Sequence, residues 1–366
     1  MFIYAEQLYR TLEEIIRIPS TSGQEEYVRA YLEKHLTSLG LQTRVDAMGN
    51  LIATMEGEGT PILLNAHMDR VAPGLGHTPI LKDGVLYSDG QTNLGADDAA
   101  GITIILEVIR RAIEQQIQLP PLVLLFTVQE ECGLCGANNF DVSRWNVADG
   151  LVFDNAFEAG VVVSNAASYE TFDITIHGKS GHPGKDLTGT VSAIDIFRQA
   201  NFVSGSLSLD QTRINIGRIN GGVARNAVPD TLTIEGEIRS FESAEIRQQY
   251  KMQIQQAFEE TAQRLGGRVS INFKMLHESY SISPDEPLLN AYRVALAQRG
   301  ANLQMQPTFI GSDTAGLRPN IRAYTISTGV VNEHTTEEHI ALEPLEQIVI
   351  DTLHILHLWR TQTSQQ

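Results

Sequence analysis

The sequence has few cysteines, few basic residues and no long apolar run, and each scarcity excludes a class of protein. Two cysteines in 366 residues cannot form the framework of a disulfide-rich secreted domain. No segment approaches the roughly 20 consecutive apolar residues of a transmembrane helix. Lys and Arg number 27 against 44 Asp and Glu, and a net charge of −17 repels a nucleic-acid backbone. Charged side chains interrupt the first 20 residues, unlike a signal peptide, so we expect a cytoplasmic protein that binds neither nucleic acid nor membrane.

The remaining composition is that of a folded globular protein, and the length suits two domains. Nearly continuous apolar runs are typical of strands buried on both faces. They occur at residues 61–66, 122–128 and 151–153, with a weaker candidate at 322–328. Residues 41–45 and 51–55 read as further strands, and helical spacing predicts helices near 102–113 and 345–359. The pattern predicts an α/β domain whose central mixed sheet is flanked by helices.

The middle of the chain has a different pattern. Alternating residues and amphipathic stretches give the order strand, helix, strand, strand, helix, strand, which is that of a split βαβ, ferredoxin-like fold. We therefore predict an inserted α+β domain at residues 168–277. Residues 1–167 and 278–366 would form the first domain.

Two local signals predict turns and helix ends. Ser22 and Glu25 have the spacing of a capping box, which would begin a helix at about Glu25 that runs to Leu39. Residues 82–84, Lys-Asp-Gly, are typical of a hairpin turn.

Residues of types that can bind metal ions follow each of the three buried strand candidates. The first is followed by His67-Met-Asp69, the second by Glu130-Glu131 and the third by Asp154. Open α/β sheets bind ligands at the carboxyl ends of their strands, so these side chains should converge. Clustered carboxylates repel one another without cations, and a His, Asp and Glu set suits zinc, cobalt or manganese.

The chain also resembles the co-catalytic zinc exopeptidases, which include peptidase T, glutamate carboxypeptidase, aminoacylase and succinyl-diaminopimelate desuccinylase. The peptidase T branch is the most similar, mainly at Gly95–Gly101 and Phe153–Gly160. The matching segments lie in the family's order: His67-Met-Asp69, Gly95–Gly101, Glu130-Glu131, Phe153-Asp154, Gly181-His-Pro-Gly184, Asn226-Ala-Val-Pro229, Gly311-Ser-Asp313 and His334.

The resemblance implies two metal ions, most simply zinc, with cobalt or manganese as alternatives. His67 and Asp154 would be terminal ligands of one ion, and Glu131 and His334 of the other. Asp97 would bridge both. Two divalent ions, these three carboxylates and a bridging hydroxide sum to zero charge, which suits a two-metal hydrolase.

The resemblance also implies the catalytic side chains. Asp69 would orient His67. Glu130 would be the general base that takes a proton from the bridging water. The peptide bond between Asp97 and Asp98 would be cis.

Substrate contacts would come from the inserted domain, acting as a lid, and from one further loop. His182 would stabilise the oxyanion of the tetrahedral intermediate. Asn226 and Arg239 would bind the polar ends of the substrate. Gly311 and Ser312 would lie against its backbone.

Other motifs have simpler interpretations. Cys132 and Cys135 have the spacing of a redox motif, but we interpret them as small loop residues beside the metal site. His339 lies one position too late for an inverted zinc-protease helix, so we do not expect it to bind metal. His354 and His357 are expected to be packing or surface residues.

Together these features predict a peptidase T-like aminopeptidase that hydrolyses short peptides. The resemblance to the peptidase T branch implies that these substrates are tripeptides. A carboxypeptidase, a dipeptidase or an N-acyl-amino-acid deacylase would use the same chemistry. A third hypothesis is a metal-binding protein without catalysis, which the presence of Glu130 disfavours. In the family that the chain resembles, the sheets of the lid domain can pair edge to edge, so the resemblance also implies a homodimer as one option.

Overall fold

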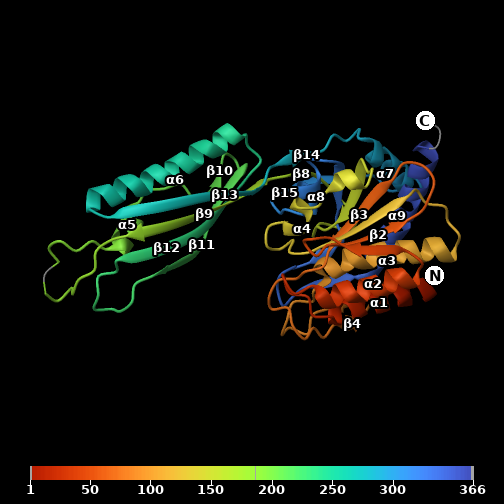
Figure 1. Cartoon of the computed structure of the whole chain (residues 1–366), viewed down its shortest axis with the longest axis horizontal. Coiled ribbons are helices and arrows are strands. Elements are labelled where there is room, and N and C mark those ends of the chain that lie inside the picture. The colour runs from red at the N-terminus through yellow and green to blue at the C-terminus, as the bar shows by residue number, and fades with distance from the viewer. Residues whose placement is uncertain (1, 186, 364–366) are drawn as a thin grey trace. The chain divides into compact units, whose positions relative to one another are not determined.

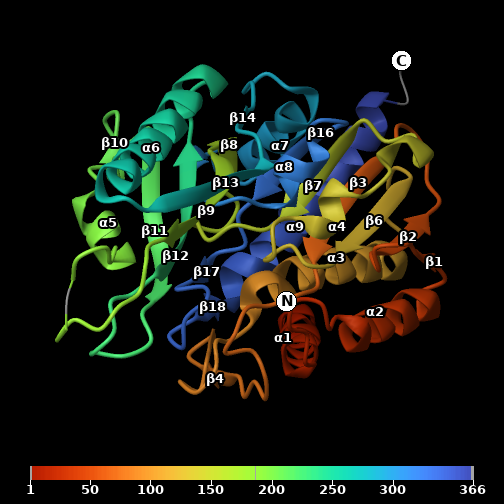
Figure 2. The same ribbon diagram turned by 60° about the vertical axis from the view of Figure 1, so that its left-hand side comes forward.

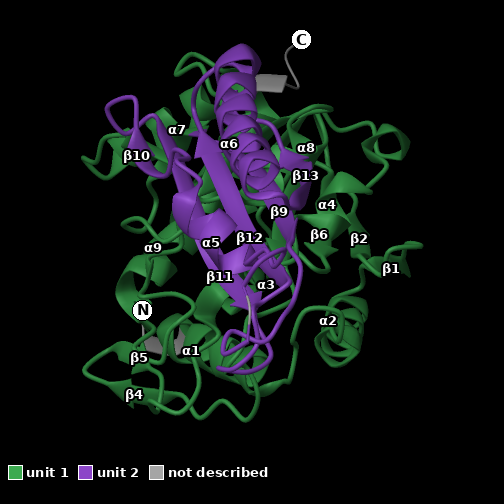
Figure 3. Cartoon of the chain, turned by 90° about the vertical axis from the view of Figure 1, so that its left-hand side faces the viewer, with its two compact units in different colours: residues 1–165, 281–366 green, residues 166–280 purple. Residues whose placement is uncertain are grey.

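The chain divides into two compact units, and each is built around its own large sheet. The computed structural model describes residues 2–185 and 187–363, so Met1 and Gln366, the outer ends of the predicted catalytic domain, lie outside the described residues. Contacts separate one unit, Met1–Asn165 with Ser281–Gln366, from a second unit, Ala166–Tyr280 (Figure 3). In the described part of the chain, no helix is both long and apolar enough to cross a membrane.

A nine-stranded mixed sheet forms the centre of the first unit (Figure 1). Neighbouring strands are, in order, β1 (Gln42–Val45), β2 (Leu51–Met55), β6 (Leu122–Thr127), β3 (Ile62–His67), β7 (Asp149–Phe153), β16 (Arg322–Ile326), β8 (Val162–Ala166) and β14 (Tyr280–Ser281), while β15 (Met305–Thr308) also pairs with β8. Strands β6, β3, β7 and β16 run parallel, and every residue of β3, β6 and β7 is buried. This burial explains their continuous apolar runs.

Helices cover both faces of this sheet (Figure 2). On one face α3 (Ala96–Glu114) packs on β3 and β7, and α1 (Phe2–Arg17) and α9 (Leu342–Thr363) pack against α3. Helix α7 (Pro287–Gln298) packs on α9. On the other face, α4 (Cys135–Asn138), the 3-10 turn η1 (Val142–Arg144) and α8 (Asp313–Leu317) cover a cluster of buried apolar side chains. The predicted α/β architecture is confirmed.

A second, four-stranded sheet belongs to the same unit. Its order is β17 (Val330–Val331), β18 (His339–Ala341), β5 (Val85–Tyr87) and β4 (Ile80–Lys82). Strands β4 and β5 are joined by Asp83 and Gly84, both with positive φ, which confirms the predicted hairpin turn.

The capping box predicted for the second helix is wrong. Helix α2 (Glu26–Ser38) begins one residue after Glu25 and has no side-chain cap. Ser22 Oγ instead donates to Asp69 Oδ2 at 2.7 Å, and Glu25 Oε1 accepts the N–H of Gln129 at 3.1 Å. Both side chains are therefore used for long-range contacts rather than for the helix.

The second unit is an antiparallel sheet with two helices on one face. Its strand order is β10 (Gly205–Leu207), β11 (Thr212–Gly221), β12 (Thr231–Ser240), β9 (Ser168–His177) and β13 (Arg268–His277). Helices α5 (Ala193–Gln199) and α6 (Ala244–Leu265) pack on it over a core of alternate strand residues. Apart from β10, this is the predicted split βαβ order.

The chain leaves and re-enters the first unit at neighbouring points. The N–H of Ile282 donates to Ser164 O at 2.8 Å, just beyond the place where β14 pairs with β8. The second unit is thus an insertion between two adjacent strands.

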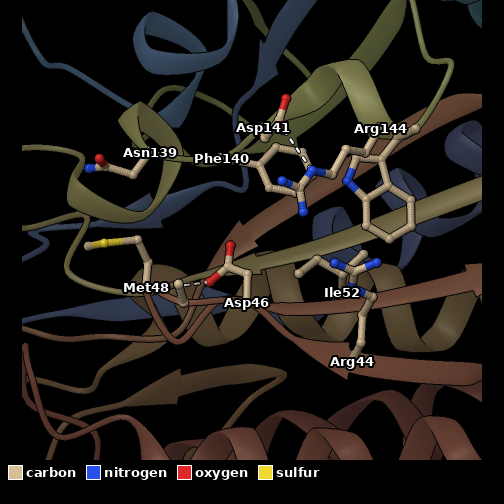
Figure 4. Close-up of a pocket in the computed structure, with 10 residues that line it drawn as sticks. Arg44, Asp46, Met48, Ile52, Asn139, Phe140, Asp141 and Arg144 are labelled. Carbon is tan, nitrogen blue, oxygen red and sulfur yellow. Dashed lines mark hydrogen bonds and ion pairs between the residues drawn. The ribbon is translucent and has the colours of Figure 1, made fainter.

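A small pocket lies at the β1–β2 edge of the main sheet (Figure 4). The guanidinium of Arg44 lies 5.0 Å from the centre of the Trp145 ring. Asp46 Oδ1 accepts the backbone N–H groups of Met48, Gly49 and Asn50 at 2.9 to 3.0 Å. This turn leads the chain into β2.

Candidate metal centre

The parallel register brings three strand ends to one edge of the sheet. His67, the last residue of β3, pairs with Thr127, the last residue of β6. Strand β7 pairs with β3 up to Asn65 and Val152, and Asp154 follows two residues later. The segments that carry Glu130 and Asp154 therefore leave the sheet at the same edge as His67.

Asp97 lies between the two histidines of the predicted site. Its Oδ1 is 3.1 Å from His67 Nε2, and its Oδ2 is 3.1 Å from His334 Nε2. His334 Nε2 is also 3.0 Å from Glu131 Oε1. One carboxylate thus contacts two imidazoles that come from β3 and from the segment between β17 and β18.

All five predicted ligands belong to overlapping groups whose ligand atoms lie within 4.8 Å of one another. These groups are His67, Asp97 and Asp154; His67, Glu130 and Glu131; and Asp97, Glu131 and His334. Asp154 Oδ2 is buried and has no hydrogen-bond partner among the described residues. A buried carboxylate oxygen without a donor fits a position that binds a cation.

The electrostatics of the cluster also fit cations. Burial raises the pKa of Glu130 and of Asp154 well above the usual range, and neighbouring carboxylates raise both further. Contacts with Asp97 and Glu131 raise the pKa of His334 to about 10. The raised pKa values mean that bound protons reduce the repulsion between the carboxylates. Divalent ions bound by the same atoms would reduce the same repulsion.

Asp69 holds both His67 and the segment that carries Glu130. His67 Nδ1 lies 2.9 Å from the backbone oxygen of Asp69 and 3.5 Å from its Oδ1. The Asp69 carboxylate also accepts the N–H groups of Glu130 at 2.9 Å and Glu131 at 3.2 Å. The contact between the Asp69 carboxylate and the Glu130 segment was not predicted, because residues 69 and 130 are too far apart in the sequence for a local pattern to connect them.

The start of α3 positions Asp97. The peptide bond between Asp97 and Asp98 is cis, as predicted. Asp98 is buried, its Oδ2 accepts the N–H of His67 at 3.1 Å, and its Oδ1 accepts that of Gly101 at 2.8 Å. A Cβ at Gly101 would lie 2.3 Å from Phe153 O, so only glycine fits there. This packing explains the last glycine of the 95–101 segment.

Comparison with known proteins identifies the family. Residues 168–265 match the M20 peptidase dimerisation domain, and residues 50–155 match peptidase family M28. The structure of a tripeptidase from Staphylococcus aureus superimposes with a TM-score of 0.91 at 29% identity, covering 98% of this chain and 99% of that one. The aminopeptidase PepT from Bacillus cereus gives 0.85 at 29% identity, covering 97% and 98%. The chain is a peptidase T-like M20 peptidase.

Sequence relatives agree with this result. Peptidase T of Clostridium novyi is 24% identical, over 98% of this chain and 92% of its own length. The uncharacterised protein YqjE of Bacillus subtilis is 29% identical, over 93% and 95%. This M20 peptidase is therefore a metal-dependent hydrolase of peptide bonds, and its carboxylate and histidine cluster suggests divalent metal ions as its cofactors.

The predicted substrate residues have varied surroundings in this M20 peptidase. Ser312 is buried, and its hydroxyl lies 2.9 Å from Thr325 Oγ1. In the second unit, His182 and Asn226 are exposed. Arg239 lies 4.0 Å from the centre of the Tyr169 ring and pairs with Glu237 at 3.3 Å. The Ser312 hydroxyl thus serves the core of the first unit.

The remaining motif residues follow two of the proposed ligands in the sequence. Cys132 and Cys135 follow Glu131, and neither forms a disulfide with another described residue. His339 stacks on Tyr87 with ring centres 5.3 Å apart. Sequence reasoning missed one further buried side chain, Glu338, whose neighbour Glu337 is exposed. The sequence pair Glu337-Glu338 does not indicate which of the two glutamates is buried.

Proposed function

We propose that this M20 peptidase is a di-zinc aminopeptidase that releases the N-terminal residue of short peptides, with tripeptides as its preferred substrates. The observation that carries the proposal is the Asp97 carboxylate, whose two oxygens contact His67 and His334 separately. Such a carboxylate suits a bridge between two ions. The two similar structures are those of a tripeptidase and of an aminopeptidase, which supports short peptides as the substrate class.

The described side chains divide into two ligand sets. His67 and Asp154 would hold one ion, Glu131 and His334 the other, and Asp97 both. Carboxylates and imidazoles suit zinc, cobalt and manganese alike, and we propose zinc. When bound, such a pair supplies Lewis-acid polarisation of the scissile carbonyl and a nucleophilic water at neutral pH.

Glu130 would be the general base. Asp69 fixes its backbone, and burial raises the pKa of its carboxyl group above the usual value, the direction that suits a proton acceptor. In the reaction Glu130 would take a proton from the attacking water and pass it to the leaving nitrogen. Asp69 would meanwhile keep His67 in one orientation.

The other predicted residues keep their proposed roles. Residues 168–277 would act as a lid, in which His182 stabilises the oxyanion and Asn226 and Arg239 bind the ends of the peptide. Gly311 and Ser312 would lie along the substrate backbone. The match to a dimerisation domain supports a homodimer through this lid, which analytical ultracentrifugation would test. A cytoplasmic location stays a prediction for cell fractionation.

The deciding experiment is product analysis by mass spectrometry. Metal-free protein is supplied with zinc, cobalt or manganese and given free tripeptides, dipeptides, C-terminally amidated peptides and N-acyl amino acids. We expect loss of the N-terminal residue from free and amidated tripeptides and no action on N-blocked substrates. Loss of the C-terminal residue, or preference for N-acyl amino acids, would overturn the aminopeptidase proposal while keeping the chemistry.

A further inference from the structure

A buried carboxylate connects the segment of His334 with the start of α3. Glu338 lies four residues after His334 and is 1% exposed. Its Oε2 accepts the N–H of Gly95 at 2.9 Å, and its Oε1 accepts the N–H of Asp97 at 3.0 Å. Its own backbone oxygen accepts the N–H of Ser88 at 3.1 Å. Both oxygens of one side chain thus bind the backbone on either side of Ala96.

These two amides lie where a helix cannot satisfy them itself. The first N–H groups of a helix have no intrahelical acceptor. Gly95 has φ +75°, and Asp97 has φ −84° and ψ 106°, so the backbone is not helical at either residue. The conformation that presents the Asp97 carboxylate therefore depends on an acceptor outside α3, and Glu338 supplies it.

Arg70 also contacts this segment. Its buried guanidinium donates to the backbone oxygens of Ile15 at 2.8 Å and Ile16 at 2.9 Å. A Cβ at Gly95 would lie 2.8 Å from Arg70 Cδ. Gly95 therefore lies in close contact with the Arg70 side chain while Glu338 binds its N–H. The segment has little freedom to move.

We propose that Glu338 is a positioning residue that fixes the Asp97 carboxylate between His67 and His334 and so sets the affinity of the centre for its second metal ion. The inference rests on the proposed two-ion function. A carboxylate can bridge two ions only if one oxygen reaches the ligand set of His67 and the other reaches that of His334. A small displacement of its backbone removes one of these two contacts. Groups that orient metal ligands typically contribute about 10- to 100-fold to metal affinity or activity.

Cobalt titration of the metal-free protein tests the proposal without a substrate. Glu338→Gln replaces one accepting oxygen by an NH2 group, so one of the two N–H groups of Gly95 and Asp97 loses its acceptor. Glu337→Gln makes the same charge change at the exposed neighbour and is the matched control. We expect Glu338→Gln to bind the first cobalt ion like the unmodified protein and the second about 10- to 100-fold more weakly. Excess cobalt should restore its turnover, and Glu337→Gln should match the unmodified protein.

The outcomes separate this inference from the proposed function. If the unmodified protein binds a single ion, the two-ion function fails. If it binds two and Glu338→Gln also binds two with unchanged affinity, even with a lower melting temperature, only the role of Glu338 fails. Should Glu338→Gln not fold, hydrogen exchange in the unmodified protein decides, because the amides of Gly95 and Asp97 must exchange slowly if Glu338 binds them. Rapid exchange there overturns the inference.

Discussion

Glu130 shows at the residue scale how a common side chain acquires a special environment. A pair of adjacent glutamates is ordinary in a sequence, and the predicted role depended on neighbours at residues 67, 97 and 154. The structure brings the Glu130 carboxylate into a buried group with His67 and Glu131. Burial then raises the pKa of Glu130 above its usual value.

Glu130→Gln should reduce kcat by about 10²- to 10⁴-fold, because the amide cannot accept the proton of the attacking water. Both metal ions should remain bound, since Glu130 lies outside the proposed ligand set. Steady-state kinetics and metal analysis of the same preparation give both values. Glu56→Gln, at an exposed position, serves as the control. Undiminished turnover in Glu130→Gln would assign the proton transfer to another group.

His77 should make stability depend on pH. Burial, and then the nearby charge of Arg70, lower the pKa of His77 below its unfolded value. The unfolded state therefore binds a proton more readily, so the contribution of His77 is complete above the unfolded pKa of about 6.5 and is lost as the pH falls below it. We expect the free energy of unfolding of the unmodified protein to fall relative to His77→Gln between pH 7 and pH 5.

Urea unfolding at several pH values measures this difference. The slope can reach about 1.4 kcal/mol per pH unit for one group. His354→Gln, at an exposed histidine, is the matched substitution for comparison. If the difference in the free energy of unfolding between His77→Gln and the unmodified protein did not change with pH, His77 would have the same pKa in the folded and unfolded states.

At the scale of elements, local patterns predicted long elements well and short ones poorly. Helix α6 has a long amphipathic pattern that ends at Gly266, which has φ +82°. Strands β14 and β17 have two residues each, too few to show any periodicity. The capping box failed because Ser22 and Glu25 bind partners 47 and 104 residues away. No local pattern carries that information.

The same reasoning explains what was foreseen of the centre. The proposed ligands were predicted because each lies in a segment that resembles a motif of the family. Glu338 was not predicted, because its partners are backbone amides at residues 95 and 97, which leave no trace in side-chain identity.

The Asp46–Asn50 turn should stabilise the segment that carries Glu130. Asn50 is fully buried, its Oδ1 accepts the N–H of Val128 at 3.1 Å, and its Nδ2 donates to Gly136 O at 3.1 Å. Asn50→Ala leaves these buried backbone groups without their partner. We expect it to lower the free energy of unfolding by about 1–3 kcal/mol for each group that finds no new partner.

Urea unfolding also tests this prediction. Asn139→Ala removes an exposed hydrogen bond to Cys135 O and should change stability by less than about 0.5 kcal/mol. Equal effects of the two substitutions would mean that Asn50 does not hold the segment between β6 and α4.

At the scale of the whole molecule, all five proposed metal ligands lie in one unit. The second unit, Ala166–Tyr280, contributes none of them. Because the N–H of Ile282 binds Ser164 O, the two points where the chain leaves and re-enters are already adjacent. The metal centre and the inserted unit are therefore separable in principle.

Replacing residues 168–279 by a short Gly-Ser linker should leave a folded protein that still binds two metal ions. Its own hydrophobic core and the complete ligand set would both remain. Circular dichroism, thermal unfolding and cobalt titration measure the result. The full-length protein is the control, and loss of one ion from a folded deletion variant would show that the second unit supplies a ligand.

The adjacency of β8 and β14 has a consequence for how such chains diversify. Recombination at these two strands would exchange the whole insert for that of a relative without breaking any pairing among β1, β2, β3, β6, β7 and β16. Substrate preference and subunit association could then change in one genetic event, while the chemistry of hydrolysis is inherited intact.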